Sequence, residues 1–408
     1  MRALGIAAVA VLLAATDRAQ PGEPPPEREF LVYAGTYTRT TVGPPTDTRS
    51  EGIYAWRFQP ATGQVTPVGL VARSPNATFL ATHPNGKVLY AVNELPNHEE
   101  TGAGTISSFA IAPASGSLTL LNRVSSLGAY PSHLATDEDG RWLFVANYGC
   151  PEPRCGGSLA VFPLQADGRI GRDPSAFVRL EGSGPNPSRQ SAPHPHSVNP
   201  SPDGRFLLVP DLGADRLRVF GFDSSSGKVS PGRRATVAFP PGAGPRHAAF
   251  GPDGRFVYVN TELTSTVRTF AWDGALGTLE ERQTVSTAAA GSIDGNLTAE
   301  IALHPDGRWL FVSNRDYEGR GRDSIAVFSV DGDRGGLTLV RSVPTLGTIP
   351  RHFAIDVSGG WLFVANQGSD SIVIYRIDRK TGALTPTRAA LEVPSPACIL
   401  FVARRLPR

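Results

Sequence analysis

One turn-and-strand phrase recurs along this chain and constrains its fold more than any other feature. At Pro252–Val259 it reads PDGRFVYV, which is a turn, one basic residue and an apolar strand. Close copies stand at five further places: Pro84–Val92, Glu138–Val145, Pro202–Val209, Pro305–Val312 and Val357–Val364. A unit that recurs in this way predicts a repeat protein, because stacked neighbours bury the apolar face that one unit leaves open.

The spacing of the phrase indicates the size of the repeating unit. Its middle glycine stands at positions 86, 140, 204, 254, 307 and 359, at intervals of 50 to 64 residues. This is close to the length of a four-stranded propeller blade with its loops. In one unit the four strands are expected at His247–Phe250, Phe256–Asn260, Thr266–Trp272 and Leu279–Val285. The third strands of the six units align at Thr105–Ile111, Ser158–Pro163, Arg216–Phe222, Thr266–Trp272, Ser324–Val330 and Ser371–Ile377.

The two ends of the chain together supply one more unit. Three strands, Phe30–Thr36, Gly52–Phe58 and Gln64–Val71, precede the first full repeat, and Pro396–Val402 resembles the first strand at Pro350–Ile355. We therefore predict an all-β, seven-bladed propeller with four-stranded blades. The C-terminal strand should join the N-terminal blade and close the ring, which leaves only short, protected edges. An open solenoid would not need this match between the ends.

The N-terminus predicts a leader ahead of a single domain. Met1-Arg2 and the apolar run Ala3–Ala15 resemble a secretory signal peptide, and the run is short for a bilayer span. We expect a signal peptide at 1–19, a linker at 20–29 and one propeller domain at 30–408. The protein would then be periplasmic or secreted, or cytoplasmic if the apolar start is only a frayed end.

Charge and cysteine content limit the partners. The formal net charge is +2 and no long basic run occurs, so nucleic acid is not expected as a partner. Cys150 and Cys155 could form a local disulfide in an oxidising compartment or remain free thiols in the cytoplasm. Cys398 lies in an apolar stretch and is expected in the core.

Strand direction identifies the functional face of the ring. In each blade the first strand lines the central channel and the marker turn joins it to the second, so the start of the first strand and the end of the second share one face. Candidate residues at first-strand starts are Ser132, His133, His194, His196, Arg246, His247, Glu300, Arg351 and His352. Those at second-strand ends include Glu94, Asn147, Tyr148, Asp211, Glu262, Asn314 and Arg315. His83 and His304 precede marker turns and should lie at the opposite face.

Arginine, histidine and glutamate converging on a concave channel fit a small anionic ligand. A structural interpretation competes, because polar residues also line water-filled channels. His247 and His352 share a repeat slot, which favours hydrogen bonding to the backbone of the next blade. Arg246, Glu262 and Arg315 favour a functional site, since buried charges need a ligand or one another. Acidic side chains could gather on the axis around a cation, but their spacing follows the blades, so no metal or cofactor is expected.

Four phrases resemble the propeller-type lactonase family, the bacterial 6-phosphogluconolactonases and, more distantly, the fungal carboxy-cis,cis-muconate lactonising enzyme. They lie at 193–220, 244–263, 299–316 and 348–375, and the similarity covers nearly all of the chain after residue 30. The resemblance implies a propeller that acts on a small anionic substrate, and we expect it to be a monomer.

The resemblance also implies site residues. The fungal enzyme has a histidine, two arginines and a glutamate as proposed active-site residues, which match His196, Arg246, Glu262 and Arg315 here. We expect six further residues to bind substrate: His133, His194, Asp211, Glu300, Asn314 and Arg351. Thr261 stands where relatives usually carry Asn, and residues Cys150–Cys155 form an insertion. Both could reshape the rim of the pocket, so the identity of the substrate stays open.

Together with these residues, the resemblance implies lactone hydrolysis, and we expect it to proceed without a metal. The carbonyl needs an activated water and stabilisation of the oxyanion. Glu262 or His196 would be the general base, while Arg246 and Arg315 would hold the oxyanion or an anionic group of the substrate. A muconate-type cycloisomerase and a non-enzymatic binding propeller are the alternatives. An exported protein would act on a lactone other than the cytoplasmic pentose-phosphate one.

Overall fold

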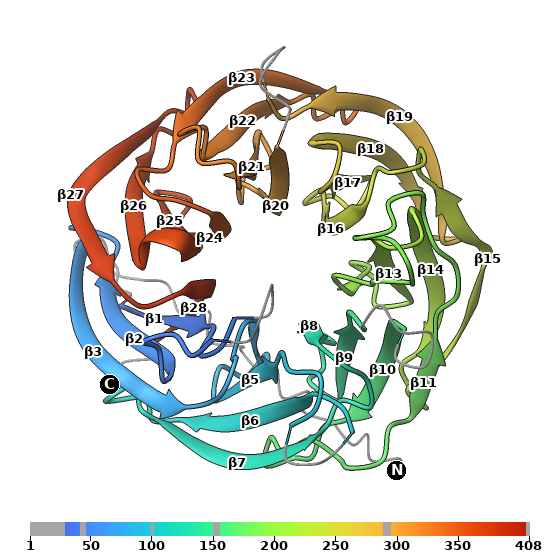
Figure 1. Cartoon of the computed structure of the whole chain (residues 1–408), viewed down its shortest axis with the longest axis horizontal. Coiled ribbons are helices and arrows are strands. Elements are labelled where there is room, and N and C mark those ends of the chain that lie inside the picture. The colour runs from blue at the N-terminus through green and yellow to red at the C-terminus, as the bar shows by residue number, and fades with distance from the viewer. Residues whose placement is uncertain (1–28, 41–45, 99–101, 150–155, 289–294, 405–408) are drawn as a thin grey trace, which may run out of the picture.

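The fold is a closed ring of strands. The computed structural model describes residues 29–40, 46–98, 102–149, 156–288 and 295–404. Seven four-stranded sheets surround one axis, which confirms the predicted seven-bladed propeller (Figure 1). Within the described ranges, no helix is long and apolar enough to cross a membrane. The predicted leader lies outside the described residues, and so do Cys150 and Cys155, for which the sequence left a disulfide or free thiols open.

The blades follow one another along the chain. Blade one holds β28 (Pro396–Ala403), β1 (Phe30–Thr36), β2 (Gly52–Gln59) and β3 (Gln64–Arg73); blade two holds β4 (Leu80–Thr82), β5 (Val88–Asn93), β6 (Thr105–Ile111) and β7 (Leu118–Ser125). Blade three holds β8 (Pro131–Thr136), β9 (Trp142–Asn147), β10 (Ser158–Pro163) and β11 (Ala176–Arg179); blade four holds β12 (Asn199–Pro200), β13 (Phe206–Asp211), β14 (Arg216–Asp223) and β15 (Lys228–Ala238). Blade five holds β16 (Pro245–Phe250), β17 (Phe256–Thr261), β18 (Thr266–Asp273) and β19 (Thr278–Ser286); blade six holds β20 (Asn296–Leu303), β21 (Trp309–Asp316), β22 (Ser324–Val330) and β23 (Leu337–Pro344). Blade seven holds β24 (Pro350–Ile355), β25 (Trp361–Asn366), β26 (Ser371–Ile377) and β27 (Leu384–Glu392), with a short 3-10 helix, η2 (Gln367–Ser369), after β25.

The ring closes as the sequence predicts. Strand β28 is the innermost strand of blade one and pairs antiparallel with β1, with Ala403 opposite Phe30 and Cys398 opposite Gly35. Figure 1 shows this C-terminal strand, in dark red, beside the blue N-terminal blade. The thiol of Cys398 is buried, as expected for a core residue.

The hydrophobic core lies between blades rather than within one. Between blades one and seven, Phe58 packs edge-on against Trp361 and Phe363, with ring centroids 5.8 and 5.0 Å apart. Second strands such as β25 are buried along their whole length because sheets cover both faces. Outer strands such as β23 alternate between buried and exposed residues. This explains why the marker strand reads as one apolar run.

A glycine contact locks neighbouring blades at the face of the marker turns. Phe206, at the start of β13, packs beneath Gly277 in the β18–β19 turn, where an added Cβ would lie 2.1 Å from the ring. Trp309 packs beneath Gly382 of the next blade in the same way, at 2.6 Å. Both glycines have positive φ, +66° and +65°, which other residues adopt only with strain. These contacts hold neighbouring blades in register at the face of the marker turns.

The marker turn is scaffold, as its repetition suggested. The ring nitrogen Nε2 of His304 lies 2.8 Å from the carbonyl oxygen of Gly359, in the marker turn of the next blade, and Nε2 of His83 lies 3.0 Å from that of Gly140. Both histidines therefore lie at the face of the marker turns, away from the predicted mouth.

Candidate active site

A cavity of about 440 Å³ opens at the predicted mouth of the channel. Of the ten residues to which the sequence assigned a catalytic or substrate-binding role, four line it: His196, Glu262, Arg315 and Arg351. They come from four consecutive blades, because the start of each first strand and the end of each second strand face the axis. A larger hollow, of about 590 Å³, lies against β18 and β19, but cationic groups do not converge there. The cavity at the mouth is therefore the candidate active site.

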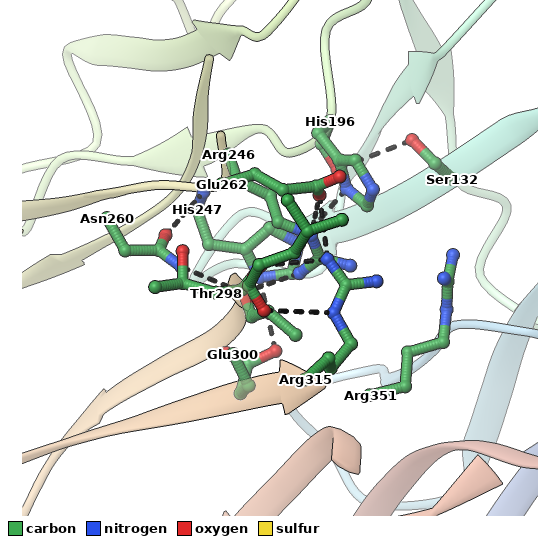
Figure 2. A network of polar contacts seen from close by, with 12 residues as sticks. Ser132, His196, Arg246, His247, Asn260, Glu262, Thr298, Glu300, Arg315 and Arg351 are labelled. Atoms are coloured by element: carbon green, nitrogen blue, oxygen red, sulfur yellow. Dashed lines mark hydrogen bonds and ion pairs between the residues drawn. The ribbon is translucent and has the colours of Figure 1, made fainter. Parts of the chain in front are cut away.

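Glu262 is the electrostatic centre of this cavity. It is 2% exposed, and its Oε2 lies 3.0 Å from Nε of Arg246 and 3.0 Å from Nη2 of Arg315 (Figure 2). Its Oε1 accepts a hydrogen bond from Arg189. Burial alone would raise the pKa of this carboxyl, but the guanidiniums of Arg315, Arg189 and Arg246 together hold it well below its usual range. Glu262 is therefore ionised, holds three cations in place, and is a weak base.

Arg246 lies beneath the cavity rather than in its wall. Its Nη1 donates to the carbonyl oxygen of Ala299 at 2.6 Å and its Nε to Glu262. Burial, followed by the charge of Arg315, lowers the pKa of Arg246 to about 10. Arg315 lines the cavity and donates to the carbonyl oxygen of Thr298 at 2.8 Å. These two guanidiniums are largely committed to protein acceptors.

Arg351 is the least committed guanidinium in the cavity wall. Its carboxylate partner, Glu94, is 3.9 Å away, and its guanidinium carbon lies 5.0 Å from the ring centre of Tyr37. Glu94 itself accepts hydrogen bonds from Tyr37, at 2.8 Å, and from Thr78, so it does not depend on Arg351. Figure 2 shows the head of Arg351 apart from the network of dashed contacts. Its N–H groups are available to an anion.

The imidazole of His196 also faces the cavity. Its Nδ1 lies 3.3 Å from Nε2 of His247. Burial, and then the charges of Arg246 and His247, lower the pKa of His196 well below its usual value. The ring is therefore neutral at neutral pH and carries one unprotonated nitrogen.

Three predicted substrate-binding residues lie outside the lining of the cavity. His194 stacks on Tyr148 with ring centroids 4.3 Å apart and an interplanar angle of 9°, and it is Tyr148 that lines the cavity. His133 is buried against Phe79, with centroids 4.1 Å apart. Glu300 lies with His247 and His352 in a chamber below the cavity floor.

Asp211 and Asn314 serve the scaffold instead. Asp211 is fully buried, contacts Nε of Arg218 at 2.9 Å and accepts the backbone N–H of His194. Asn314 donates to the carbonyl oxygen of Thr287 at 3.1 Å. At the ends of second strands these short side chains turn toward the loop that enters the first strand, so they do not reach the axis.

The channel histidines fulfil the predicted structural role only in part. His352 accepts the backbone N–H of Ile399, in the next blade, at 3.2 Å, as expected. The prediction is wrong for His247, whose ring contacts the side chains of His196 and Glu300.

Arg189 is the main charged residue of the cavity that the sequence did not reveal. It lies in the loop before β12, donates to Glu262 and lines the cavity. No strand position marks it, because this loop belongs to no repeat. The available signal is the 64-residue interval between Gly140 and Gly204, which is the longest between marker glycines. Tyr130 and Tyr317 complete the wall from loops in the same way.

No metal set accompanies these groups. Across the described ranges, no cluster of three or more histidine, cysteine, aspartate or glutamate side chains is placed to hold a metal ion.

The fold and the mouth define a propeller lactonase: the chain belongs to the family described as Lactonase, 7-bladed beta-propeller, which matches residues 31–401. It is similar to the 6-phosphogluconolactonase of Bacillus subtilis, with 32% identity over 378 residues, 92% of this chain and 99% of the relative. A 6-phosphogluconolactonase of Formosa agariphila is 35% identical over 357 residues, covering 86% of this chain and 94% of the relative. The solved structure of a periplasmic gluconolactonase from Pseudomonas aeruginosa has a TM-score of 0.83 at 35% identity, covering 92% of this chain and all of that one.

Proposed function

We propose that this protein hydrolyses a small, anionic, sugar-type lactone, as the names of its 6-phosphogluconolactonase relatives suggest. The observation that carries the proposal is the pairing, in one cavity, of a neutral imidazole on His196 with the guanidinium of Arg351, whose carboxylate partner is 3.9 Å away. The first suits a general base and the second suits an anionic group of the substrate.

The charge balance of the site favours an anion. Four guanidiniums (Arg189, Arg246, Arg315 and Arg351) face three carboxylates (Glu94, Glu262 and Glu300) in and beneath the cavity, which leaves one positive charge in excess when all three are ionised. A phosphate or carboxylate of the substrate would balance this excess. We assign that group to Arg351, because the other three guanidiniums all contact Glu262.

In the proposed mechanism His196 is the general base. Its Nε2 takes a proton from water as the water oxygen attacks the lactone carbonyl carbon. The N–H groups of Arg315 stabilise the resulting oxyanion. When the ring C–O bond breaks, the leaving oxygen takes the proton back from His196. Glu262 holds the arginines in place rather than acting as the base, because three cations depress its basicity.

Export is the second part of the proposal. The apolar N-terminal run and the similarity to a periplasmic gluconolactonase support a location outside the cytoplasm. Separation of periplasm from cytoplasm, with detection of a C-terminal tag, tests this. A mature chain confined to the cytoplasm would contradict it.

A lactone panel tests the activity. Ring opening is followed by pH-stat for glucono-1,5-lactone, its 6-phosphate and a carboxylated muconolactone, with spontaneous hydrolysis subtracted and with chelator in a parallel series. We expect the highest kcat/KM for a lactone that carries a negative charge, and no loss with chelator. Absence of turnover throughout the panel would contradict a lactonase, and conversion of a carboxylated diene to a lactone would favour the cycloisomerase.

A further inference from the structure

Three titratable side chains form a line beneath the cavity. Nδ1 of His196 lies 3.3 Å from Nε2 of His247, and Nδ1 of His247 lies 3.1 Å from Oε2 of Glu300 (Figure 2). They belong to blades four, five and six, and their exposed fractions are 7%, 5% and 9%. The proposed mechanism uses only the first of them. The other two need an explanation, because buried ionisable groups are costly unless they are paired.

The carboxylate fixes the direction of every proton in this line. An ionised Glu300 carries only acceptor oxygens, so its Oε2, 3.1 Å away, favours the proton of His247 on Nδ1, and Nε2 of His247 is then the acceptor for Nδ1–H of His196. Nε2 of His196 is then unprotonated, and in the described part of the chain it has no hydrogen-bond partner. A protonated Glu300 would reverse the donor and acceptor roles along the line and place a proton on Nε2 of His196.

Electrostatics favours a proton at the far end of the line. Burial and the nearby charges of Arg246, His247 and Arg351 all lower the pKa of His196, which disfavours an imidazolium there. Glu300 has two imidazoles at ion-pair distance instead of guanidiniums. Burial raises the pKa of Glu300, against the opposing charges of His352 and Arg246. A carboxylic acid there adds no positive charge to the cationic cavity.

The surroundings of Glu300 leave its Oε2 able to take a proton. Nε2 of His352 is 3.4 Å from Oε2, and neither this contact nor that of His247 is aligned as a good hydrogen bond. Cys398 lies behind, with its sulfur 3.8 Å from Nε2 of His352. The void beside them is about 10 Å³, room for one water molecule at most. Exchange with bulk water is therefore restricted, and the imidazole line is the route to the cavity.

We propose that His247 and Glu300 are positioning residues that form a proton relay behind His196. As water attacks the lactone, its proton goes to Nε2 of His196, the Nδ1 proton of His196 passes to His247, and the Nδ1 proton of His247 passes to Glu300. Both imidazoles end neutral and the carboxylate becomes a carboxylic acid. When the ring C–O bond breaks, the alkoxide takes the Nε2 proton and the line runs back to its starting state.

The relay rests on the proposed lactonase activity, and Glu300→Gln tests it. Glutamine keeps the shape but cannot accept a proton, so we expect kcat for glucono-1,5-lactone or its 6-phosphate to fall at least about 100-fold, with KM within threefold. The double variant His196→Ala/Glu300→Gln should be no slower than His196→Ala alone. The proton inventory in H2O–D2O mixtures should be curved for the wild type and linear for Glu300→Gln.

The matched control is His304→Gln. His304 is 3% exposed and lies 2.8 Å from Asp306, so it repeats the histidine–carboxylate pair at the opposite face of the ring. We expect its kcat and KM to stay within twofold of the wild type. A Glu300→Gln variant with kcat within threefold of the wild type, a rise in KM alone as for a substrate ligand, or a linear wild-type inventory would overturn the relay.

Imidazole ¹⁵N spectra test the same arrangement without turnover. Signals are assigned by their loss in His196→Gln and His247→Gln. The relay requires both rings to carry their proton on Nδ1 when Glu300 is ionised, and both on Nε2 when it is protonated. A mixed pair of tautomers at every pH would overturn the proposal, even if the lactone panel showed no substrate. If the panel fails and the two tautomers change together, the proposed function is wrong while the proton line stands.

Discussion

Replacement of Arg351 by methionine should separate charged from uncharged lactones. Met keeps most of the apolar stem but removes the donors that the cavity leaves free. The side chain of Arg351 is 17% exposed, so an anion beside it is partly desolvated. A charge-assisted hydrogen bond contributes about 1.5–3 kcal/mol, and at about 1.4 kcal/mol per tenfold its loss lowers kcat/KM about 10- to 150-fold. Folding should survive, because Tyr37 and Thr78 still satisfy Glu94.

The assay compares kcat/KM for 6-phosphoglucono-1,5-lactone and glucono-1,5-lactone in wild type and variant. We expect the loss for the phosphorylated substrate and a change below threefold for the uncharged one. Arg172→Met, an exposed substitution in the loop between β10 and β11, is the control and should leave both values unchanged. Equal losses for the two lactones, or no loss for either, would refute the assignment of Arg351 to the anionic group.

Four further predictions concern Glu262, His196, Gly277 and strand β28. Glu262→Gln should lower the free energy of unfolding by about 3–5 kcal/mol at pH 7, because it removes the carboxylate that compensates two buried cations, Arg246 and Arg315, and the half-buried Arg189. In denaturant titrations this deficit should be complete above about pH 4.3 and shrink below it. The folded-state pKa of Glu262 is depressed, so its contribution to stability falls as the pH drops from the unfolded-state pKa toward the folded-state pKa. For the wild type, kcat/KM should not change as the pH falls to about 6.5, the ordinary pKa of histidine, and should decline only at lower pH. The reason is that the pKa of His196 is lowered, so its imidazole remains a neutral base. Gly277→Ala should cost about 1–3 kcal/mol by clashing with Phe206 while kcat is unchanged. Deletion of β28 should abolish cooperative unfolding by circular dichroism, because blade one loses its inner strand.

The fold could be predicted from the sequence because each repeat contains the turn and the apolar strand that define one blade. The marker phrase at Pro252–Val259 combines a turn with a strand that is buried on both faces, and the ends match because Pro396–Val402 fills the missing first-strand position. Neither inference needs any long-range contact to be known in advance. The lengths of short inner strands were harder to predict, and β12 consists of Asn199–Pro200 only.

The site was only partly predictable. The direction of a strand shows which face of the ring a residue lies at, but not how far along the channel its side chain lies. It placed His196, Glu262 and Arg315 in one cavity correctly. It could not show that Glu300 lies below the floor, since that depends on how first strands stagger around the axis. Arg189 comes from a loop outside the repeat, and its reach toward Glu262 follows from packing that no periodicity records.

The most direct test of the central claim is the rate of lactone ring opening by His196→Ala against wild type at pH 7. The claim is that a neutral imidazole in a cationic cavity activates the water. It predicts that kcat falls about 100- to 10,000-fold once spontaneous hydrolysis is subtracted, while the midpoint of unfolding is little changed. A variant that opens the lactone at the wild-type rate would contradict the account.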